Sequence, residues 1–137
     1  MEKRNPIIAP AVSAGNLVNL ERGKLPPQAV DLEEAVIGAM LIDKKGVDEV
    51  IDILQPEAFY KEANQHVFTA IHTLFETSEP IDLLTVSACL RKMGLLEKVG
   101  GDFYLVQLSK KVSTSAHIEF HARIILQKFI QRSLIKI

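Results

Sequence analysis

Few side chains in this sequence have the type and spacing that chemistry requires. His117 and His121 are four residues apart, so on a helix they would share one side and could bind the same metal ion. The glutamate of an HExxH motif is missing between them, and the neighbouring sequence offers neither a third ligand nor a cysteine cluster. We therefore expect two surface histidines and predict no metal site.

Paired carboxylates could act as general acids and bases. The pairs Glu33–Glu34 and Asp48–Glu49 each fall in the first turn of an expected helix, where the helix dipole alone favours negative charge. Cys89, the single cysteine, lies on an apolar stripe and is expected to be a core residue instead of a nucleophile. Nothing resembles a nucleophile paired with its base, so the sequence predicts no catalytic residue.

The composition indicates one globular domain and a tail. The chain has 137 residues, of which 47% are hydrophobic and 24% charged, which suits one compact core. Met1–Gln28 contains four prolines and two glycines without a sustained period, and is expected to be flexible. A single cysteine favours a reducing, cytoplasmic setting. No apolar run reaches the roughly 18 residues that a membrane span needs, so we expect no membrane partner.

The helix expected over Ala63–Phe75 is the predicted centre of the core. At about 100° per residue, its large apolar side chains occupy an arc of about 120°. They are Val67, Phe68, Ile71, Leu74 and Phe75. Burying such side chains at roughly 1.5–3 kcal/mol each contributes on the order of 10 kcal/mol. The neighbouring helices are therefore expected to dock on this face.

Shorter helices are expected on either side of the central one. The stretch Asp31–Ile42 should begin with a capping box made by Asp31 and Glu34. Its second half is apolar nearly all round, which predicts burial on several sides. After the central helix, Asp82 should cap the next one. Every element expected in this part of the chain is a helix.

Gly100 and Gly101 form a break before a further short helix. Such a pair can belong to a loop that binds phosphate, but no GxGxxG or GxxxxGK[ST] pattern surrounds it, so a structural turn is expected. In the helix that follows, Phe103 lies on the side opposite Tyr104 and Leu105. We therefore expect this helix to be wedged between two neighbours.

The final helix should start near Thr114 or Ser115 and continue to Ile137. Its apolar residues spread over roughly 180° of surface, and one neighbour cannot cover them all. A helix of about 22 residues spans about 33 Å, so its end should project beyond the core. The sequence stops in mid-pattern without a capping glycine, which indicates a fragment of a longer protein. The outer half of this helix is expected to pack on a following helix or another subunit.

The last segment of the chain is basic. Lys110–Ile137 has six bases and one acid, whereas Asp31–Glu62 has nine acids and three bases. A basic surface can bind nucleic acid. The bases on the final helix are scattered around it, however, and no recognition-helix or aromatic pattern accompanies them, so a solvated face is expected. A helical domain that binds DNA directly remains the alternative function.

Six stretches of the sequence, taken together in their order and spacing, form a recognisable pattern. They are Pro26–Asp43 (PPQAVDLEEAVIGAMLID), Pro56–Tyr60 (PEAFY), His66–Ile71 (HVFTAI), Glu79–Val86 (EPIDLLTV), Leu95–Leu108 (LLEKVGGDFYLVQL) and Ser115–Lys128 (SAHIEFHARIILQK). In their order and spacing, the chain from Leu25 onward resembles the N-terminal domain of the bacterial replicative DNA helicase, the DnaB family. The departures are modest: Lys44 stands where proline is common, His121 stands where an aromatic residue is often found, and the tail is longer than usual.

The resemblance implies an all-α fold in three parts. These are a tail at 1–25, expected to be flexible from its composition, and, as the resemblance implies, a compact multi-helix domain at 26–112 and the first, truncated arm of a helical hairpin at 113–137. It also implies that the ATPase motor, with its ATP and magnesium, lies in a later domain, so that this fragment is no enzyme and holds no cofactor. The implied role is that of a collar on a hexameric ring through which DNA passes, with other helicase subunits and the helicase-binding domain of primase as partners.

By analogy with the family, a few residues are candidates for contacts with the missing arm, a neighbouring subunit or primase. They are Tyr104, Ile124, Phe129, Leu134 and Ile135. The resemblance does not divide them among the three partners. A physical argument also favours those on the final helix, because that helix carries more apolar surface than one domain can cover.

Overall fold

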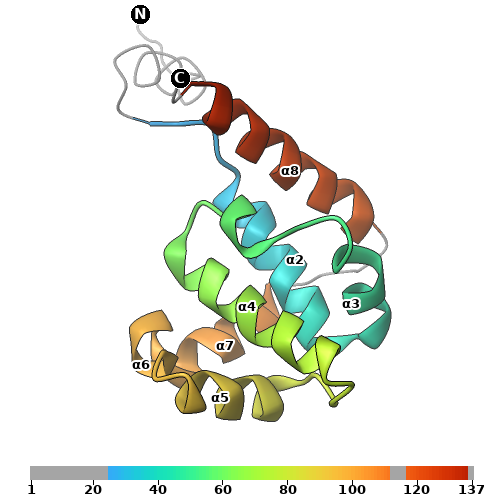
Figure 1. Cartoon of the computed structure of the whole chain (residues 1–137), viewed down its shortest axis with the longest axis vertical. Coiled ribbons are helices and arrows are strands. Elements are labelled where there is room, and N and C mark those ends of the chain that lie inside the picture. The colour runs from blue at the N-terminus through green and yellow to red at the C-terminus, as the bar shows by residue number, and fades with distance from the viewer. Residues whose placement is uncertain (1–24, 112–116, 136–137) are drawn as a thin grey trace, which may run out of the picture.

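A computed structural model describes residues 25–111 and 117–135 of the chain (Figure 1). The α-helices are α2 (Val30–Ile42), α3 (Lys44–Val50), α4 (Glu62–Glu76), α5 (Leu83–Lys92), α6 (Leu96–Val99), α7 (Gly101–Lys110) and α8 (Ile118–Ile135), and a short 3-10 helix, η1 (Pro56–Ala58), precedes α4. All regular structure in these ranges is helical, which confirms the predicted all-α fold. None of the described helices is long and apolar enough to cross a membrane.

α2 is the helix around which the others are arranged. It contacts α3, α4, α5, α7 and α8 (Figure 1). Its second half is buried on several sides, as its apolar sequence predicts. The buried apolar residues of α2 are Val36, Ile37, Ala39, Met40 and Leu41. The prediction that the neighbouring helices dock on Ala63–Phe75 needs correction, because α3, α7 and α8 have their most extensive contacts with α2.

α4 buries the face that its sequence predicts, with one exception. Phe68 and Ile71 are fully buried, and Phe68 packs against Phe59 with the ring centroids 5.1 Å apart. Phe75, which was predicted to share this face, is 40% exposed. It lies in the last turn of α4, and the chain stays exposed through the following turn. This end of the helix therefore extends past the neighbours that cover Phe68.

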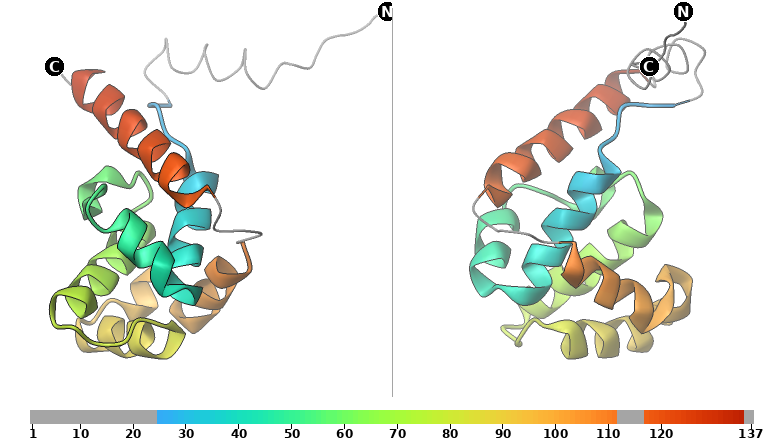
Figure 2. Two further views of the ribbon diagram at one scale, coloured as in Figure 1. Left: turned by 90° about the vertical axis from the view of Figure 1, so that its right-hand side faces the viewer. Right: turned by 180° about the vertical axis from the view of Figure 1, so that it is seen from behind.

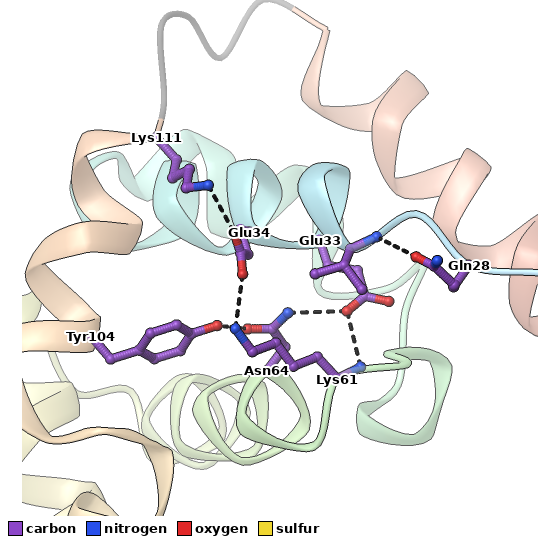
Figure 3. Close-up of polar contacts among 8 residues, drawn as sticks. Gln28, Glu33, Glu34, Lys61, Asn64, Tyr104 and Lys111 are labelled. Carbon is purple, nitrogen blue, oxygen red and sulfur yellow. Dashed lines mark hydrogen bonds and ion pairs between the residues drawn. The ribbon is translucent and has the colours of Figure 1, made fainter. Parts of the chain in front are cut away.

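The two predicted helix caps have different outcomes. Asp82 caps α5 as predicted: its Oδ1 accepts a hydrogen bond from Thr85 N at 2.9 Å, and Thr85 Oγ1 accepts one from Asp82 N at 2.8 Å. The capping box predicted for α2 is wrong, because the N-cap residue is Ala29, and it is Gln28 Oε1 that accepts a hydrogen bond from Val30 N at 3.1 Å (Figure 3). Asp31 is exposed. Glu34 is buried instead, where it binds lysines from other parts of the chain.

The turn predicted at Gly100 and Gly101 is confirmed. Gly100 ends α6 with a φ of 113°, in the left-handed region that glycine adopts without strain. α7 then packs against α2, α5 and α6, and its Leu105 and Leu108 are each 1% exposed. Phe103, on the other side of α7, is 71% exposed. The described part of the chain thus covers one side of α7, which corrects the expectation that this helix is wedged between two neighbours.

α8 packs on α2, α3 and η1, and its C-terminal turns project beyond the other helices in both views of Figure 2. Its buried residues all lie in its first half. The predicted start near Thr114 or Ser115, the predicted end at Ile137 and most of the predicted tail at 1–25 lie outside the described residues. The predicted domain boundaries therefore remain predictions.

Candidate docking surface

The distal half of α8 carries apolar side chains that the described chain leaves exposed. The buried anchors of this helix, at most 2% exposed, are Ile118, Ala122 and Ile125. Past them the exposed fraction is 50% at Ile130, 65% at Leu134 and 59% at Ile135, and we call these three residues the arm surface. Ile130 is an addition to the predicted contacts. Exposed apolar side chains gathered at one end of a helix are typical of a protein contact.

The structure separates Tyr104 from the other predicted contact residues. Leu134 and Ile135 are exposed on α8, whereas Ile124 is half-buried and Phe129 packs against the core. Tyr104 lies on α7, which makes no contact with α8 among the described residues. The residues on α8 therefore form one group, and Tyr104 faces a different part of the molecule.

Tyr104 turns its hydroxyl into the molecule (Figure 3). The hydroxyl donates a hydrogen bond to Asn64 Oδ1 at 2.5 Å, and Lys61 Nζ lies 4.6 Å from the centroid of the Tyr104 ring. Burial raises the pKa of Tyr104, so its hydroxyl remains protonated and can donate. A partner can reach only the exposed part of the ring, because the polar end is already bonded.

Tyr104 belongs to a group of interacting polar side chains that we call the polar junction. Its members are Glu33, Glu34, Lys61, Asn64, Tyr104 and Lys111. Glu33 is 1% exposed. Its carboxylate accepts hydrogen bonds from Tyr60 N at 2.7 Å, Lys61 N at 3.3 Å and Asn64 Nδ2 at 3.0 Å. The N-cap residue of α4 offers no capping side chain, so Glu33 supplies from α2 the acceptor and negative charge that this helix end needs.

Glu34 joins α2 to two other segments (Figure 3). Its Oε2 lies 3.0 Å from Lys61 Nζ, and its Oε1 lies 3.0 Å from Lys111 Nζ. Burial raises the pKa of Glu34, but the two lysines together outweigh burial and hold that pKa below its ordinary value of 4.5. For Lys61, burial lowers the pKa, and the contacts with Glu34 and Tyr104 more than offset it, so the pKa is raised. Glu34 is thus ionised at neutral pH and ties α2 to the start of α4 and the end of α7.

Arg132 lies beside the arm surface. Its Nη1 donates a hydrogen bond to Pro27 O at 2.8 Å, and its Nη2 donates one to Ala58 O at 2.9 Å. The guanidinium carbon lies 5.3 Å from the ring centroid of Tyr60 and 5.8 Å from that of Phe129. Burial lowers the pKa of Arg132, because desolvation disfavours the charged guanidinium. The distal half of α8 is thereby connected to the segment before α2 and to the end of η1.

The residues first considered for chemistry do not form a reactive site. The ring centroids of His117 and His121 are 6.4 Å apart, and no group of three His, Cys, Asp or Glu side chains in the described ranges could hold a metal ion. Burial raises the pKa of the Cys89 thiol, which lowers its thiolate content. The helix dipole of α2 does not by itself explain Glu33 and Glu34, because their carboxylates bind donors from other elements.

Comparison with known proteins identifies the family of this helical domain. A family model described as the DnaB-like helicase N terminal domain matches residues 25–127. The chain belongs to this family. It is 46% identical over 114 residues to the replicative DNA helicase DnaB of Rhodothermus marinus, and 40% identical over 113 residues to that of Geobacillus stearothermophilus. These alignments cover 83% and 82% of this chain but 12% and 25% of the two relatives, so the chain spans a quarter or less of their length.

Solved structures share the fold of this DnaB-type domain. The crystal structure of the N-terminal domain of DnaB helicase from Mycobacterium tuberculosis matches with a TM-score of 0.79 at 38% identity, covering 82% of this chain and 81% of that one. A structure described as "The Structure Of A DnaB-Like Replicative Helicase And Its Interactions With Primase" matches with a TM-score of 0.68, covering 77% of this chain and 25% of that one. At 24% identity, the second likeness is one of fold alone.

Sequence reasoning misses the polar contacts of this DnaB-type domain for a physical reason. The partners of Arg132, Pro27 and Ala58, are 105 and 74 residues away along the chain, so no local spacing could indicate them. Glu33 lies in the first turn of a helix, where an exposed acid and a buried one have the same local pattern. One signal is present: Asn64 falls inside the apolar arc of α4, and a polar residue on an apolar face indicates a buried hydrogen bond.

Proposed function

We propose that this chain is the N-terminal collar domain of a hexameric replicative DNA helicase, and that it mediates subunit assembly and primase docking during DNA replication. The ATPase motor, with its ATP and magnesium, then belongs to a later domain of the parent protein, and DNA passes through the assembled ring in the cytoplasm. Membership of the DnaB family and relatives that are replicative DNA helicases support this proposal. The structural neighbour described with primase makes primase the partner to test first.

The arm surface is the single observation that carries the docking role. Ile130, Leu134 and Ile135 are each at least half exposed. Fully burying one such side chain contributes roughly 1.5–3 kcal/mol, so a second arm, another subunit or primase gains affinity by covering them. Of the predicted contacts, Leu134 and Ile135 are the best placed for such a partner, and Tyr104 would belong to a separate contact.

Ile135→Lys tests the docking role. Lysine in the last turn of a helix is compatible with the helix dipole, so helicity measured by circular dichroism should not change. Ile42→Lys is the matched control, because Ile42 also ends a helix and is 56% exposed against 59% for Ile135. We expect I135K to weaken self-association in sedimentation and primase binding in calorimetry by roughly tenfold, or about 1.4 kcal/mol.

Two outcomes would contradict the proposed function. If I135K and I42K assemble and bind the helicase-binding domain of primase equally well, the arm surface is not the docking surface. If the unmodified chain is a concentration-independent monomer with α8 intact, the assembly role is wrong for this chain.

Direct DNA binding, the alternative function, has less support because several bases of the last segment already have partners. Lys111 pairs with Glu34 at 3.0 Å. Arg123 pairs with Glu119 at 3.0 Å, and Arg132 binds backbone carbonyls. These groups are less available to phosphates. A binding constant for DNA that falls steeply with salt concentration would favour the alternative.

A further inference from the structure

α8 is anchored unevenly along its length. Its fully buried residues lie in its first half, and from Ile130 to the end of the helix no described side chain is buried. In between, Leu126 and Phe129 are partly buried against the core. Apolar contact has no preferred direction, so two partly buried side chains hold the helix against the core without fixing its angle. Helix packing favours particular crossing angles with a scatter of about 15–20°, so a directional contact in this half would narrow the range further.

Arg132 provides such a contact. A guanidinium is planar and presents its donors in a fixed fork, so two of its N–H groups reach two separate acceptors in only a narrow range of orientations. Here the acceptors are Pro27 O at 2.8 Å and Ala58 O at 2.9 Å. Pro27 precedes α2 and Ala58 ends η1, so the end of α8 is bonded to two different segments of the globular part.

The segment that Arg132 binds is itself held by Glu33. Glu33 accepts hydrogen bonds from Tyr60 N and Lys61 N, directly after η1. Arg132 binds Ala58 O in the same segment and lies over the Tyr60 ring. The negative charge of Glu33 also favours the charged form of Arg132, against the effect of burial. The acceptor at Ala58 is thus held in place by the polar junction, and α8 must adapt to it.

We propose that Arg132 is a positioning residue that sets the angle of the distal half of α8 relative to the globular helices. Because Ile130, Leu134 and Ile135 lie on either side of Arg132 along the same helix, this angle determines where the arm surface is presented. The role goes beyond the proposed function, since it concerns how the chain holds its own arm and does not depend on which partner covers the arm surface.

Distances between spin labels, measured by pulsed electron paramagnetic resonance in the 137-residue chain, test this role. In a Cys89→Ser background, one pair of labels is placed at Thr73 and Ser133, beyond Arg132. A second pair is placed at Thr73 and Glu119, before Arg132, and all the labelled positions are exposed. Labelled chains are diluted into unlabelled chains, so that self-association adds no further distances.

Arg132→Met removes every donor and keeps an unbranched apolar stem, whereas Arg132→Lys keeps the charge and loses the fork. Arg123→Met, measured with the Thr73–Ser133 pair so that Glu119 is kept, is the matched control, because Arg123 is an exposed arginine of the same helix that pairs with Glu119. We expect R132M to broaden and shift the Thr73–Ser133 distance and to leave the Thr73–Glu119 distance unchanged. R132K should restore part of the narrow distribution, and R123M should match the parent chain.

An unchanged, narrow Thr73–Ser133 distribution in R132M would overturn the proposal, because the packing of Leu126 and Phe129 would then be sufficient. Equal broadening of both distances would overturn it too, since α8 would be leaving the core as a whole. If R132M does not fold, R132K carries the same test, and a distribution identical to that of the parent would show that the fork is not needed.

Discussion

α4 and α8 both carry a broad apolar face, and the two faces have different surroundings. On α4, Phe68 and Ile71 are 0% exposed beneath neighbours that include η1, α5 and α6. On α8, Leu134 and Ile135 are 65% and 59% exposed, because the helix projects beyond the other helices. An apolar pattern thus predicts that a face will be covered, but it does not say whether the same chain or a partner covers it.

This difference separates two kinds of mutational effect. Truncating a side chain that its own chain covers lowers the free energy of unfolding, because it leaves a cavity in the fold. Truncating a side chain that a partner covers lowers the free energy of association and leaves folding nearly unchanged. Measuring both free energies on the same variants therefore tests whether α4 and α8 differ in this way.

Phe68→Ala is expected to have the largest effect on stability. Phe68 is fully buried against Phe59, and truncating a buried phenylalanine lowers the free energy of unfolding by about 3–5 kcal/mol. Urea unfolding at one fixed protein concentration measures this loss, since association would add apparent stability. The matched control is Phe120→Ala on α8, where the side chain is 64% exposed and the loss should stay under about 0.5 kcal/mol. Equal losses for the two variants would remove the contrast between the helices.

Glu33→Gln should have the next largest effect. The amide keeps the size of the side chain but turns one acceptor oxygen into a donor that faces other donors. Leaving a buried donor unpaired costs about 1–3 kcal/mol, so the free energy of unfolding should fall by this amount. Glu57→Gln, an exposed glutamate on η1, is the control. If the two variants unfold at the same urea concentration, the cap that Glu33 gives to α4 is dispensable.

The helices could be predicted from the sequence because their signals are local. Asp82 caps α5 through a residue three positions away, and Phe68 and Ile71 share a face because a helix repeats every 3.6 residues or so. The predictions that Phe75 and Phe103 are covered were wrong because the exposure of a side chain is not a local property. Their exposure depends on where neighbouring helices end, and no spacing within their own helices contains that information.

The candidate site was only partly predictable. The apolar surplus of the final helix indicates a docking surface, and the exposure of Leu134 and Ile135 agrees with that expectation. The polar contacts join residues far apart in the chain: Glu33 is 31 residues from Asn64 in the polar junction, and Arg132, which holds the arm, is 105 residues from Pro27. Such pairs form only after the core has brought their elements together, so a single sequence does not indicate them.

A smaller, pH-dependent effect is expected at Glu34, because Lys61 and Lys111, its partners, are half exposed and solvent screens the pairs. The pKa of Glu34 is lowered, so its contribution is complete above the ordinary value of 4.5 and is lost as the pH falls through the lower pKa of the fold. The stability difference between the parent chain and Glu34→Gln should therefore hold at neutral pH and shrink in acid. Urea midpoints at a series of pH values measure it. A difference that is the same at every acidic pH would mean that the ion pairs of Glu34 contribute nothing.

Leu134→Ala should have the smallest effect on folding, and it tests most directly whether a partner covers the end of α8. The side chain is 65% exposed, so the free energy of unfolding should change by less than about 0.5 kcal/mol. Association measured by sedimentation equilibrium should nevertheless weaken, since each methylene that a partner buries contributes roughly 0.8 kcal/mol. Ile42→Ala, at 56% exposure away from the arm surface, should change neither quantity.

A large loss of folding stability in L134A would mean that its own chain covers the end of α8. No change in either quantity would mean that nothing covers it, because a side chain that any partner buries must contribute to one of the two free energies.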